Sequence, residues 1–307
     1  MGKEDITVII PVYNRAAIVM RTLRSVGCQT YRPFHVILVD NGSTDGTLDI
    51  LRQWKRSAES EDLTIDILSE PTPGATAARN RGLAAATSEY VMFFDSDDTM
   101  HPTHVERAMR GFSHPSHPDV VGWDVTMHDI HGHTRHAIFS AVSPLWHNIM
   151  NGSMATQRYA ARTSLIRKAG GWDTSIRGWN DIELGARLLK SNPVMLKLAG
   201  DPTVEIFQQN ESITGTGFTQ GAGRWEKSLD AIEATLTAPR HRRWVRLRRA
   251  HLAGLYAAEG SHTLSQDLLK ATLAAEPSPL YRSLLRATCA LTARKIRGAL
   301  RLFRPLF

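Results

Sequence analysis

The sequence predicts an α/β fold in which a mixed, mainly parallel sheet is followed by a helical C-terminal appendage. In the first hundred residues, short apolar or β-branched runs alternate with segments of helical spacing, which is the pattern of β-α-β units. The apolar runs end in acidic and turn-forming residues, and ligands of open parallel sheets bind at the carboxyl ends of the strands. Beyond residue 239 the chain becomes rich in leucine, alanine and arginine. We therefore expect an α/β domain over residues 1–238 and a basic helical region over residues 239–307.

Strands are predicted where apolar residues run without interruption between turn residues. The segment 36–39, Val-Ile-Leu-Val, has no polar alternation, which is typical of a parallel strand covered on both faces. Turn residues follow at 40–46, where Ser43 or Thr44 is expected to cap the next helix. A break at 71–74 precedes an alanine-rich helix. The predicted strands are 6–12, 34–40, 63–68 and 90–95, and the alanine-rich helix covers 75–86.

The last of these strands ends in three carboxylates, Asp95, Asp97 and Asp98. This much negative charge at one strand end is unfavourable unless a positive group lies on it. Divalent Mg²⁺ and Mn²⁺ prefer carboxylate oxygens and complete their coordination shell with phosphate oxygens. The run therefore predicts a metal site that carries a diphosphate. Asp98 has a second interpretation, as the cap of the following helix.

The bulk composition is that of a globular protein of 307 residues with one substantial core. Only Cys28 and Cys289 occur, which indicates neither a disulfide framework nor a zinc ribbon and fits a reducing compartment. No apolar run approaches the roughly 18 residues that a membrane span needs, and the N-terminus enters the first strand without a signal peptide. We expect a cytoplasmic protein.

The net charge of +7 is unevenly distributed. From Arg240 onward the chain carries +11, whereas residues 1–239 carry −4. The basic region has helical spacing broken by Gly260, Pro277 and Pro279, which predicts two or three helices. Nucleic acid is not expected as a partner, because interleaved aromatic residues and base-reading motifs are missing.

A basic amphipathic stretch over residues 281–304 has three interpretations. It could rest on anionic lipid, which would place the protein peripherally on the inner face of the membrane. It could pack on the α/β domain with its arginines in solvent. Its apolar face could also mediate self-association into a homo-oligomer.

Nine of the thirteen histidines lie between His101 and His147. A structural zinc site would require cysteine or carboxylate partners at a fixed spacing, which this tract lacks. The interpretation that we prefer is a polar, irregular excursion over the sheet.

Five segments in a fixed order carry the functional signal. The fifth comprises Gly-Gly-Trp-Asp at 170–173 and Gly-Trp-Asn-Asp-Ile-Glu-Leu at 178–184. In order and spacing the five resemble family 2 glycosyltransferases of the GT-A fold, over roughly residues 4–215. The resemblance implies that residues 1–238 form a Rossmann-like catalytic domain that uses Mn²⁺ or Mg²⁺. The first four segments are Pro-Val-Tyr-Asn-Arg at 11–15, Val-Asp-Asn-Gly-Ser-Thr-Asp-Gly at 39–46, Ala-Arg-Asn-Arg-Gly at 78–82 and Asp-Ser-Asp-Asp at 95–98.

The resemblance also implies roles for single residues. Asp97 would ligate the metal that bridges the diphosphate, and Asp95 would hold the ribose or water around that metal. Asp181 would be the general base that deprotonates the acceptor, so that a single displacement inverts the anomeric carbon. Trp172 and Trp179 would either pack in the core or form a wall of the acceptor pocket. The implied nucleotide-sugar contacts are Pro11, Tyr13, Arg15, Asp40, Arg79, Asp95 and Ser96, with Arg79 near the base.

Three positions depart from the family pattern. Asn180 stands where an acidic residue often precedes the base, and Asn41 replaces a common second aspartate. Gln209 stands where many relatives have a histidine that helps to bind the metal or the diphosphate. Metal binding would then be weaker, or another group would hold the diphosphate, such as the loop 215–223. That loop would close over the donor or serve only as a mobile connector, whereas Glu183 is expected to be structural.

The function expected from these residues is metal-dependent, inverting transfer of a hexose from a nucleoside diphosphate, most simply UDP, to an acceptor. The acceptor could be a saccharide, a lipid-linked molecule, a peptide or a small molecule. One alternative is a non-catalytic module that binds nucleotide sugar or carbohydrate. A second, a sugar nucleotidyltransferase, would need a glycine-rich loop with a basic residue, which residues 11–15 do not supply. A dehydrogenase would need Gly-x-Gly-x-x-Gly after the first strand, and this is absent.

Overall fold

The computed structural model describes residues 5–208, 217–296 and 298. The chain forms two compact units, each assembled from three segments. The first unit consists of Met1–Pro144, Ser153–Ser175 and Ser191–Gln209, and the second consists of Leu145–Gly152, Ile176–Lys190 and Asn210–Phe307. The predicted domain boundary between residues 238 and 239 remains a prediction.

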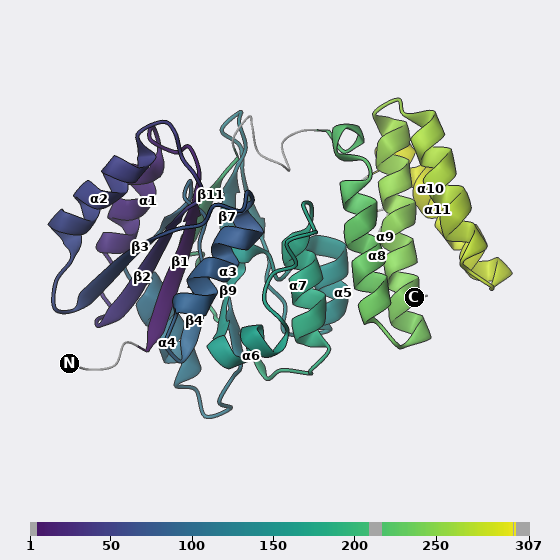
Figure 1. Cartoon of the computed structure of the whole chain (residues 1–307). Coiled ribbons are helices and arrows are strands. Elements are labelled where there is room, and N and C mark those ends of the chain that lie inside the picture. The colour runs from purple at the N-terminus through teal and green to yellow at the C-terminus, as the bar shows by residue number, and fades with distance from the viewer. Residues whose placement is uncertain (1–4, 209–216, 297, 299–307) are drawn as a thin grey trace. The chain divides into compact units, whose positions relative to one another are not determined.

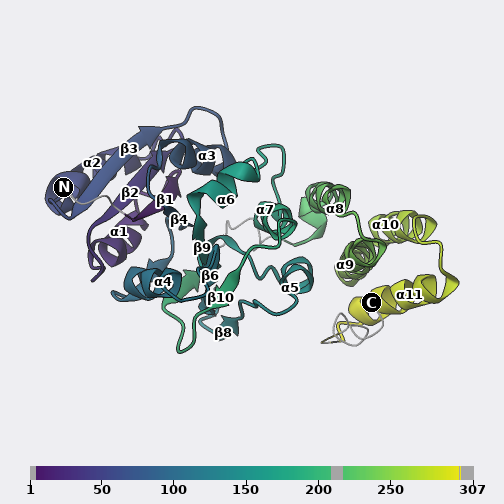
Figure 2. The same ribbon diagram turned by 90° about the horizontal axis from the view of Figure 1, so that it is seen from below.

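The first unit is built on a seven-stranded sheet with the order β10-β6-β9-β4-β1-β2-β3 (Figure 1 and Figure 2). β1 is parallel to β2 and β4, and β2 is parallel to β3, whereas β9 is antiparallel to both β4 and β6. The sheet is therefore mixed and mainly parallel, as the sequence predicts. Its strands are β1 (Ile6–Val12), β2 (Phe34–Asp40), β3 (Leu63–Ser69), β4 (Tyr90–Phe93), β6 (Val120–Gly122), β9 (Tyr159–Arg162) and β10 (Met195–Lys197).

Helices cover both faces of this sheet, which explains why every residue of β1 and β2 is buried. Apolar side chains of α1, α2 and α4 share one core cluster with alternate residues of β1 and β2. α3 lies on the opposite face (Figure 2). A Cβ at Gly82 would be 2.4 Å from Cγ2 of Ile9. Only glycine allows α3 to approach β1 this closely. The helices of the unit are α1 (Val19–Gly27), α2 (Thr47–Ala58), α3 (Ala75–Ala85), α4 (His104–Phe112), α6 (Thr163–Lys168) and the 3-10 turn η1 (Thr156–Arg158).

The histidine-rich tract is not the irregular excursion that we predicted. It contains α4, β6 and two strands of a second sheet with the order β5-β11-β7-β8. Fully buried residues such as Val105, Val121 and Val125 supply the core positions between the histidines. Among the residues that the structure describes, no group of three or more potential metal ligands converges. The strands of the second sheet are β5 (Thr99–Met100), β7 (Val125–His128), β8 (Thr134–Ala137) and β11 (Val204–Phe207).

The second unit is helical. Its core contains Trp146, Trp225, Trp244 and Tyr256, and the partly buried Trp179 packs against them. Two or three helices are predicted after residue 239, and the described residues form three, with breaks at the predicted glycine and prolines. The helices are α5 (Pro144–Asn151), α7 (Asn180–Leu189), α8 (Arg224–Thr235), α9 (Pro239–Ala258), α10 (His262–Ala274) and α11 (Pro279–Ala293), with the 3-10 turn η2 at Thr219–Gly221.

Part of the apolar face predicted for residues 281–304 is covered within this unit. Leu285 and Cys289 are buried, and Thr292 accepts or donates a hydrogen bond with His251 of α9 at 2.9 Å. α11 therefore packs on α9 along this face, while residue 297 and residues 299–307 lie outside the described residues. No helix in the described ranges is long and apolar enough to cross a bilayer.

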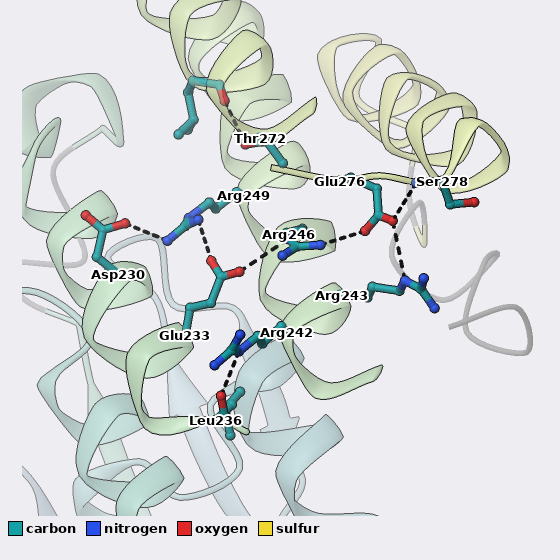
Figure 3. A network of polar contacts seen from close by, with 11 residues as sticks. Asp230, Glu233, Leu236, Arg242, Arg243, Arg246, Arg249, Thr272, Glu276 and Ser278 are labelled. Carbon is teal, nitrogen blue, oxygen red and sulfur yellow. Dashed lines mark hydrogen bonds and ion pairs between the residues drawn. The ribbon is translucent and has the colours of Figure 1, made fainter. Parts of the chain in front are cut away.

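Ion pairs neutralise much of the charge on α9 (Figure 3). Arg246 bridges Glu233 of α8, at 3.2 Å, and Glu276 of the α10–α11 connection, at 2.9 Å. Arg249 likewise joins Glu233, at 2.6 Å, to Asp230, at 2.5 Å. Glu276 is fully buried and also accepts the Ser278 N–H at 3.1 Å. The basic composition of this region is thus partly an internal requirement of helix packing.

Replacing Glu276 with glutamine should destabilise the second unit by about 3 kcal/mol, because Arg243 and the largely buried Arg246 would lose the charge of a fully buried partner. The matched variant Asp230→Asn should cost less than about 1 kcal/mol, since the Asp230 side chain is 70% exposed. Urea unfolding followed by circular dichroism measures both values. Equal losses in the two variants would contradict the assigned importance of the buried pair.

Candidate active site

The loops that follow β1 and β2 lie side by side because these strands are parallel and in register, with Val12 opposite Asp40. Asn14 joins the two loops. It adopts a left-handed conformation with φ 48°, which asparagine tolerates better than most residues. Its N–H donates to Ser43 Oγ at 3.0 Å, and its Oδ1 accepts the Thr44 N–H at 2.9 Å. The motifs at 11–15 and 39–46 therefore form one rigid surface.

Ser43 and Thr44 do not cap α2, contrary to the sequence-based prediction. The N-cap position is Gly46, and the nearby Asp45 instead accepts the Thr47 N–H at 3.1 Å. Ser43 is engaged by Asn14 across the loops. This long-range contact competes with the local cap and has no signature in the sequence around Ser43.

Four predicted nucleotide contacts lie at the ends of β1 and β2 or on the loop that follows β1. Pro11 is buried in β1, and Tyr13 directly after the strand is 56% exposed. Asp40 at the end of β2 is 4% exposed, and both its carboxylate oxygens lie 3.4 Å from the Ser43 N–H. Arg15 lies 3.9 Å from Asp97, and its buried Nε has no hydrogen-bond partner among the described residues.

The three carboxylates after β4 are brought together, as the sequence predicts. Ser96 between them is buried, and the Asp97 side chain remains 20% exposed. Burial, followed by the charge of Asp95, raises the pKa of Asp97 to about 6. Burial and then the charges of Asp97 and Asp95 hold the pKa of Asp98 well above its usual value. The ionised forms of Asp97 and Asp98 are therefore disfavoured here, and a bound cation would stabilise them.

Both oxygens of Asp95 are occupied by protein donors. Arg79 Nη2 donates to Oδ1 at 2.7 Å, and Gln157 Nε2 donates to Oδ2 at 2.5 Å. The same Gln157 nitrogen lies 2.5 Å from Asp98 Oδ2, and Asp98 Oδ1 accepts the Phe207 N–H at 2.9 Å. Sequence reasoning missed Gln157, because nothing in its local pattern indicates a contact with residues some sixty positions earlier.

Asp98 does not cap the following helix. α4 begins at His104 with Thr103 at its N-cap, whereas the Asp98 side chain is 1% exposed and lies in the carboxylate cluster. Its backbone carbonyl accepts the Thr22 hydroxyl at 2.7 Å. Asp98 is therefore a buried acceptor that helps to fix Gln157.

Trp172 packs within the first unit. Its backbone N–H donates to Asn80 Oδ1, and its carbonyl accepts from Asn80 Nδ2, both at 2.8 Å. Its ring lies beneath the guanidinium of Arg79, 4.5 Å away, and meets Phe93 edge to face. Of the two sequence-based interpretations of Trp172, this environment supports core packing. The predicted contact of Arg79 with a nucleotide base stays a prediction.

Asp181 and Trp179 belong to the second unit. Asp181 lies in the first turn of α7, is partly exposed, and accepts the Ile182 N–H at 2.8 Å. Glu183 is buried and forms a bidentate pair with Arg187, with distances of 2.6 and 2.7 Å, which supports its predicted structural role.

Gln209 lies outside the described residues. The described part of the predicted loop, from Gly217 to Gly223, is held by Glu259 at the end of α9. The Glu259 carboxylate accepts the Phe218 N–H at 2.8 Å and the Thr219 N–H at 2.7 Å.

The residues after β4 fit a hard divalent cation. Asp97 supplies a partly exposed carboxylate, while both oxygens of Asp95 and Asp98 already accept hydrogen bonds. No larger set of protein ligands converges in the described part of the chain, so phosphate oxygens and water would complete the shell. This is how Mg²⁺ is usually bound beside phosphates.

Comparison with known proteins decides the family. The model of the family described as "Glycosyl transferase family 2" matches residues 7–161, which is half of the chain. The chain belongs to this family. The predicted family is confirmed, and the glycosyltransferase prediction is confirmed at that level.

Relatives among curated proteins match part of the chain. Glycosyltransferase AglE of Haloferax volcanii is 35% identical over 122 residues, which cover 39% of each protein. The putative teichuronic acid biosynthesis glycosyltransferase TuaG of Bacillus subtilis is 36% identical over 107 residues, covering 35% of this chain and 41% of TuaG. The matched region thus spans well under half the length of these relatives.

Solved structures share the fold along nearly the whole chain. S. aureus TarS 1-349 in complex with UDP-GlcNAc has a TM-score of 0.70 at 18% identity, covering 98% of this chain and 92% of that one. The mannosyltransferase PcManGT from Pyrobaculum calidifontis, in complex with GDP-Man and Mn²⁺, has a TM-score of 0.60 at 20% identity, covering 99% and 88%. The predicted GT-A fold with C-terminal helices is confirmed.

Replacing Gln157 with methionine keeps the volume but removes the donor shared by Asp95 and Asp98. Because groups that orient a metal site typically contribute 10–100-fold to affinity, we expect UDP to bind at least about tenfold more weakly in the presence of Mn²⁺. Isothermal titration calorimetry measures this, with exposed Gln53→Met as the control. Unchanged affinity in Gln157→Met would show that the bridge does not order the site.

Proposed function

We propose that the protein is a metal-dependent, inverting glycosyltransferase that moves a hexose from UDP to an acceptor nucleophile. The observation that carries the proposal is the placement of Asp97 beside Arg15, at a strand end where two motif loops meet in a family 2 glycosyltransferase fold. A cation and a diphosphate would each find complementary charge there.

The β1 and β2 loops have the chemistry of a nucleotide site. The exposed Tyr13 ring offers an apolar face to a planar base, and the buried Asp40 carboxylate can accept a base N–H or a ribose hydroxyl. The buried, unpartnered Arg15 Nε can donate to an anionic oxygen. UDP is favoured because TarS was solved with UDP and with UDP-GlcNAc, whereas GDP in PcManGT is the second candidate.

The metal would be held by Asp97, with phosphate oxygens completing its shell. When bound, Mn²⁺ or Mg²⁺ would stabilise the negative charge that develops on the leaving nucleoside diphosphate. Asp95 would be oriented by Arg79 and Gln157 and so would contact the ribose or metal-bound water. Arg15 would neutralise part of the diphosphate charge.

Asp181 would act as the general base. It would take the proton of the acceptor hydroxyl as the acceptor oxygen forms its bond to the anomeric carbon. The bond from that carbon to the diphosphate oxygen breaks on the opposite face, so the configuration inverts. The partial exposure of Asp181 in the first turn of α7 supports this role over that of a non-catalytic sugar-binding module. The acceptor class stays open among saccharides, lipid-linked molecules, peptides and small molecules.

Loss of the proposed metal ligand should abolish donor turnover. We expect slow release of UDP from one member of a UDP-hexose panel in the presence of Mn²⁺, suppressed by EDTA and lowered at least about 100-fold in Asp97→Asn. Luminescent detection of the released diphosphate measures it. The exposed carboxylate of Asp62 provides the control Asp62→Asn, which should match wild type. Turnover that survives EDTA would contradict metal dependence.

Loss of the proposed base should affect chemistry but not donor binding. General bases contribute about 10²–10⁴-fold, so Asp181→Asn should reduce turnover by at least 100-fold while calorimetric affinity for UDP with Mn²⁺ stays within about twofold. Asp267→Asn, an exposed aspartate of α10, serves as the matched control. If the wild type and Asp181→Asn turn over the donor at similar rates, another residue is the base.

A further inference from the structure

The helix that carries Asp181 begins at a strained residue. Trp179, the N-cap of α7, has φ 46° and ψ 34°, a left-handed conformation that bulky side chains rarely adopt. Such a conformation persists only where the surrounding structure fixes it, and such residues cluster at functional sites. Because Asp181 is two residues further along, the direction in which its carboxylate leaves the chain depends on this turn.

The backbone of the turn is held from α8. Ser228 Oγ donates a hydrogen bond to the Gly178 carbonyl. A Cβ at Gly178 would lie 2.8 Å from the Trp225 ring, so only glycine fits at this position in the observed packing. The Trp179 carbonyl accepts the Glu183 N–H at 3.0 Å and so begins the helix.

The side chain of Trp179 is held by an aromatic group and one cation. Its ring centroid lies 4.9 Å from that of Trp225 and 6.3 Å from that of Phe218. The guanidinium of Arg248, from α9, lies 4.6 Å from the Trp179 ring. An arginine over an indole face is a favourable cation–π contact, and it is stronger where water is excluded.

Arg248 differs from its neighbours on α9. Arg243, Arg246 and Arg249 each pair with a carboxylate, whereas no ion pair of Arg248 is found among the described residues. Its Nη1 donates to the Met150 carbonyl at 2.8 Å, and its buried Nε has no hydrogen-bond partner in the same ranges. Burial lowers the pKa of its guanidinium to about 10, so the group remains charged at neutral pH. This charge is in contact with the face of the Trp179 ring and with the Met150 carbonyl.

We propose that Arg248 is a positioning residue for the reaction: by stacking on Trp179 it fixes the left-handed turn that orients Asp181. The inference rests on the proposed role of Asp181 as the base and extends it. It also assigns a function to α9, since the helix would then be part of the catalytic machinery. The basic region after residue 239 would be required for chemistry as well as for packing.

Hydrogen exchange tests the positioning step without any substrate. In Arg248→Met, amides of the peptide 178–184 should exchange at least about tenfold faster than in wild type, because local opening of the turn becomes easier. The control is Arg240→Met, which removes an exposed α9 arginine 5.4 Å from the ring of Trp244 and should leave that peptide unchanged. Unchanged exchange at 178–184 in Arg248→Met would overturn the proposal. If exchange rises throughout the second unit, Arg248→Met has destabilised the whole unit, and Arg248→Lys is measured in its place. Lysine keeps the charge but lacks the planar group that stacks on the ring.

Turnover tests whether Arg248 acts through Trp179. Arg248→Met should lower UDP release by about 10- to 100-fold while the affinity for UDP with Mn²⁺ stays within about twofold, since small misplacements of a catalytic group have effects of this size. In a Trp179→Gly background, where glycine adopts the left-handed turn without strain, Arg248→Met should change turnover less than about twofold. If the fold-reduction in turnover of the double variant equals the product of those of the two single variants, Arg248 acts independently of Trp179, which contradicts the proposal.

The two measurements separate the inference from the proposed function. If wild type releases no diphosphate from any donor, the proposed function fails, and hydrogen exchange alone decides whether Arg248 fixes the turn. If wild type is active and exchange responds but turnover does not, the turn is fixed by Arg248 without serving catalysis, and the positioning role is rejected.

Discussion

The concentration of negative charge at the end of β4 is the constraint on which the first unit depends. Three carboxylates follow one buried strand, and they differ in burial and in the hydrogen bonds that they accept. Asp95 receives one donor on each oxygen, from Arg79 and Gln157. Asp98 is buried, and burial together with its acidic neighbours favours its neutral form by raising its pKa. Asp97 keeps a partly exposed carboxylate without so close a donor, which is why we propose it as the ligand of the cation.

The second unit contains a similar concentration of charge, here positive. α9 brings a row of arginines into a helical core, where unpaired charge is costly. Arg246 and Arg249 share Glu233, and the fully buried Glu276 completes the pairing. Arg248 differs from these two, because an aromatic face takes the place of a carboxylate. Among the described residues Arg248 has no ion pair, and it contacts the turn before Asp181, which is why packing and proposed chemistry meet at this residue.

Much of the fold could be predicted from the sequence because its strands have strong local signals. The predicted bounds of β1 and β2 agree with the structure, since both are uninterrupted apolar runs ended by turn residues. The histidine-rich tract was misjudged because its polar residues alternate with the few buried valines that build β6 and β7. Ser43 was misjudged because a partner thirty residues away, Asn14, outcompetes the local cap. Local patterns cannot report such competition.

In the candidate site, the residues of the motifs could be predicted, whereas the residues that orient them could not. The aspartates, Arg15 and Tyr13 could be found because they lie in short segments whose order is informative. Gln157, Phe207 and Arg248 could not, because each makes its contacts with residues far away in the sequence, and nothing in its own neighbourhood indicates them. Groups that touch a ligand are constrained in type and spacing, whereas groups that orient them need only reach the right atom. In this chain one such contact, that of Arg248 with Trp179, comes from a helix that follows all five motifs.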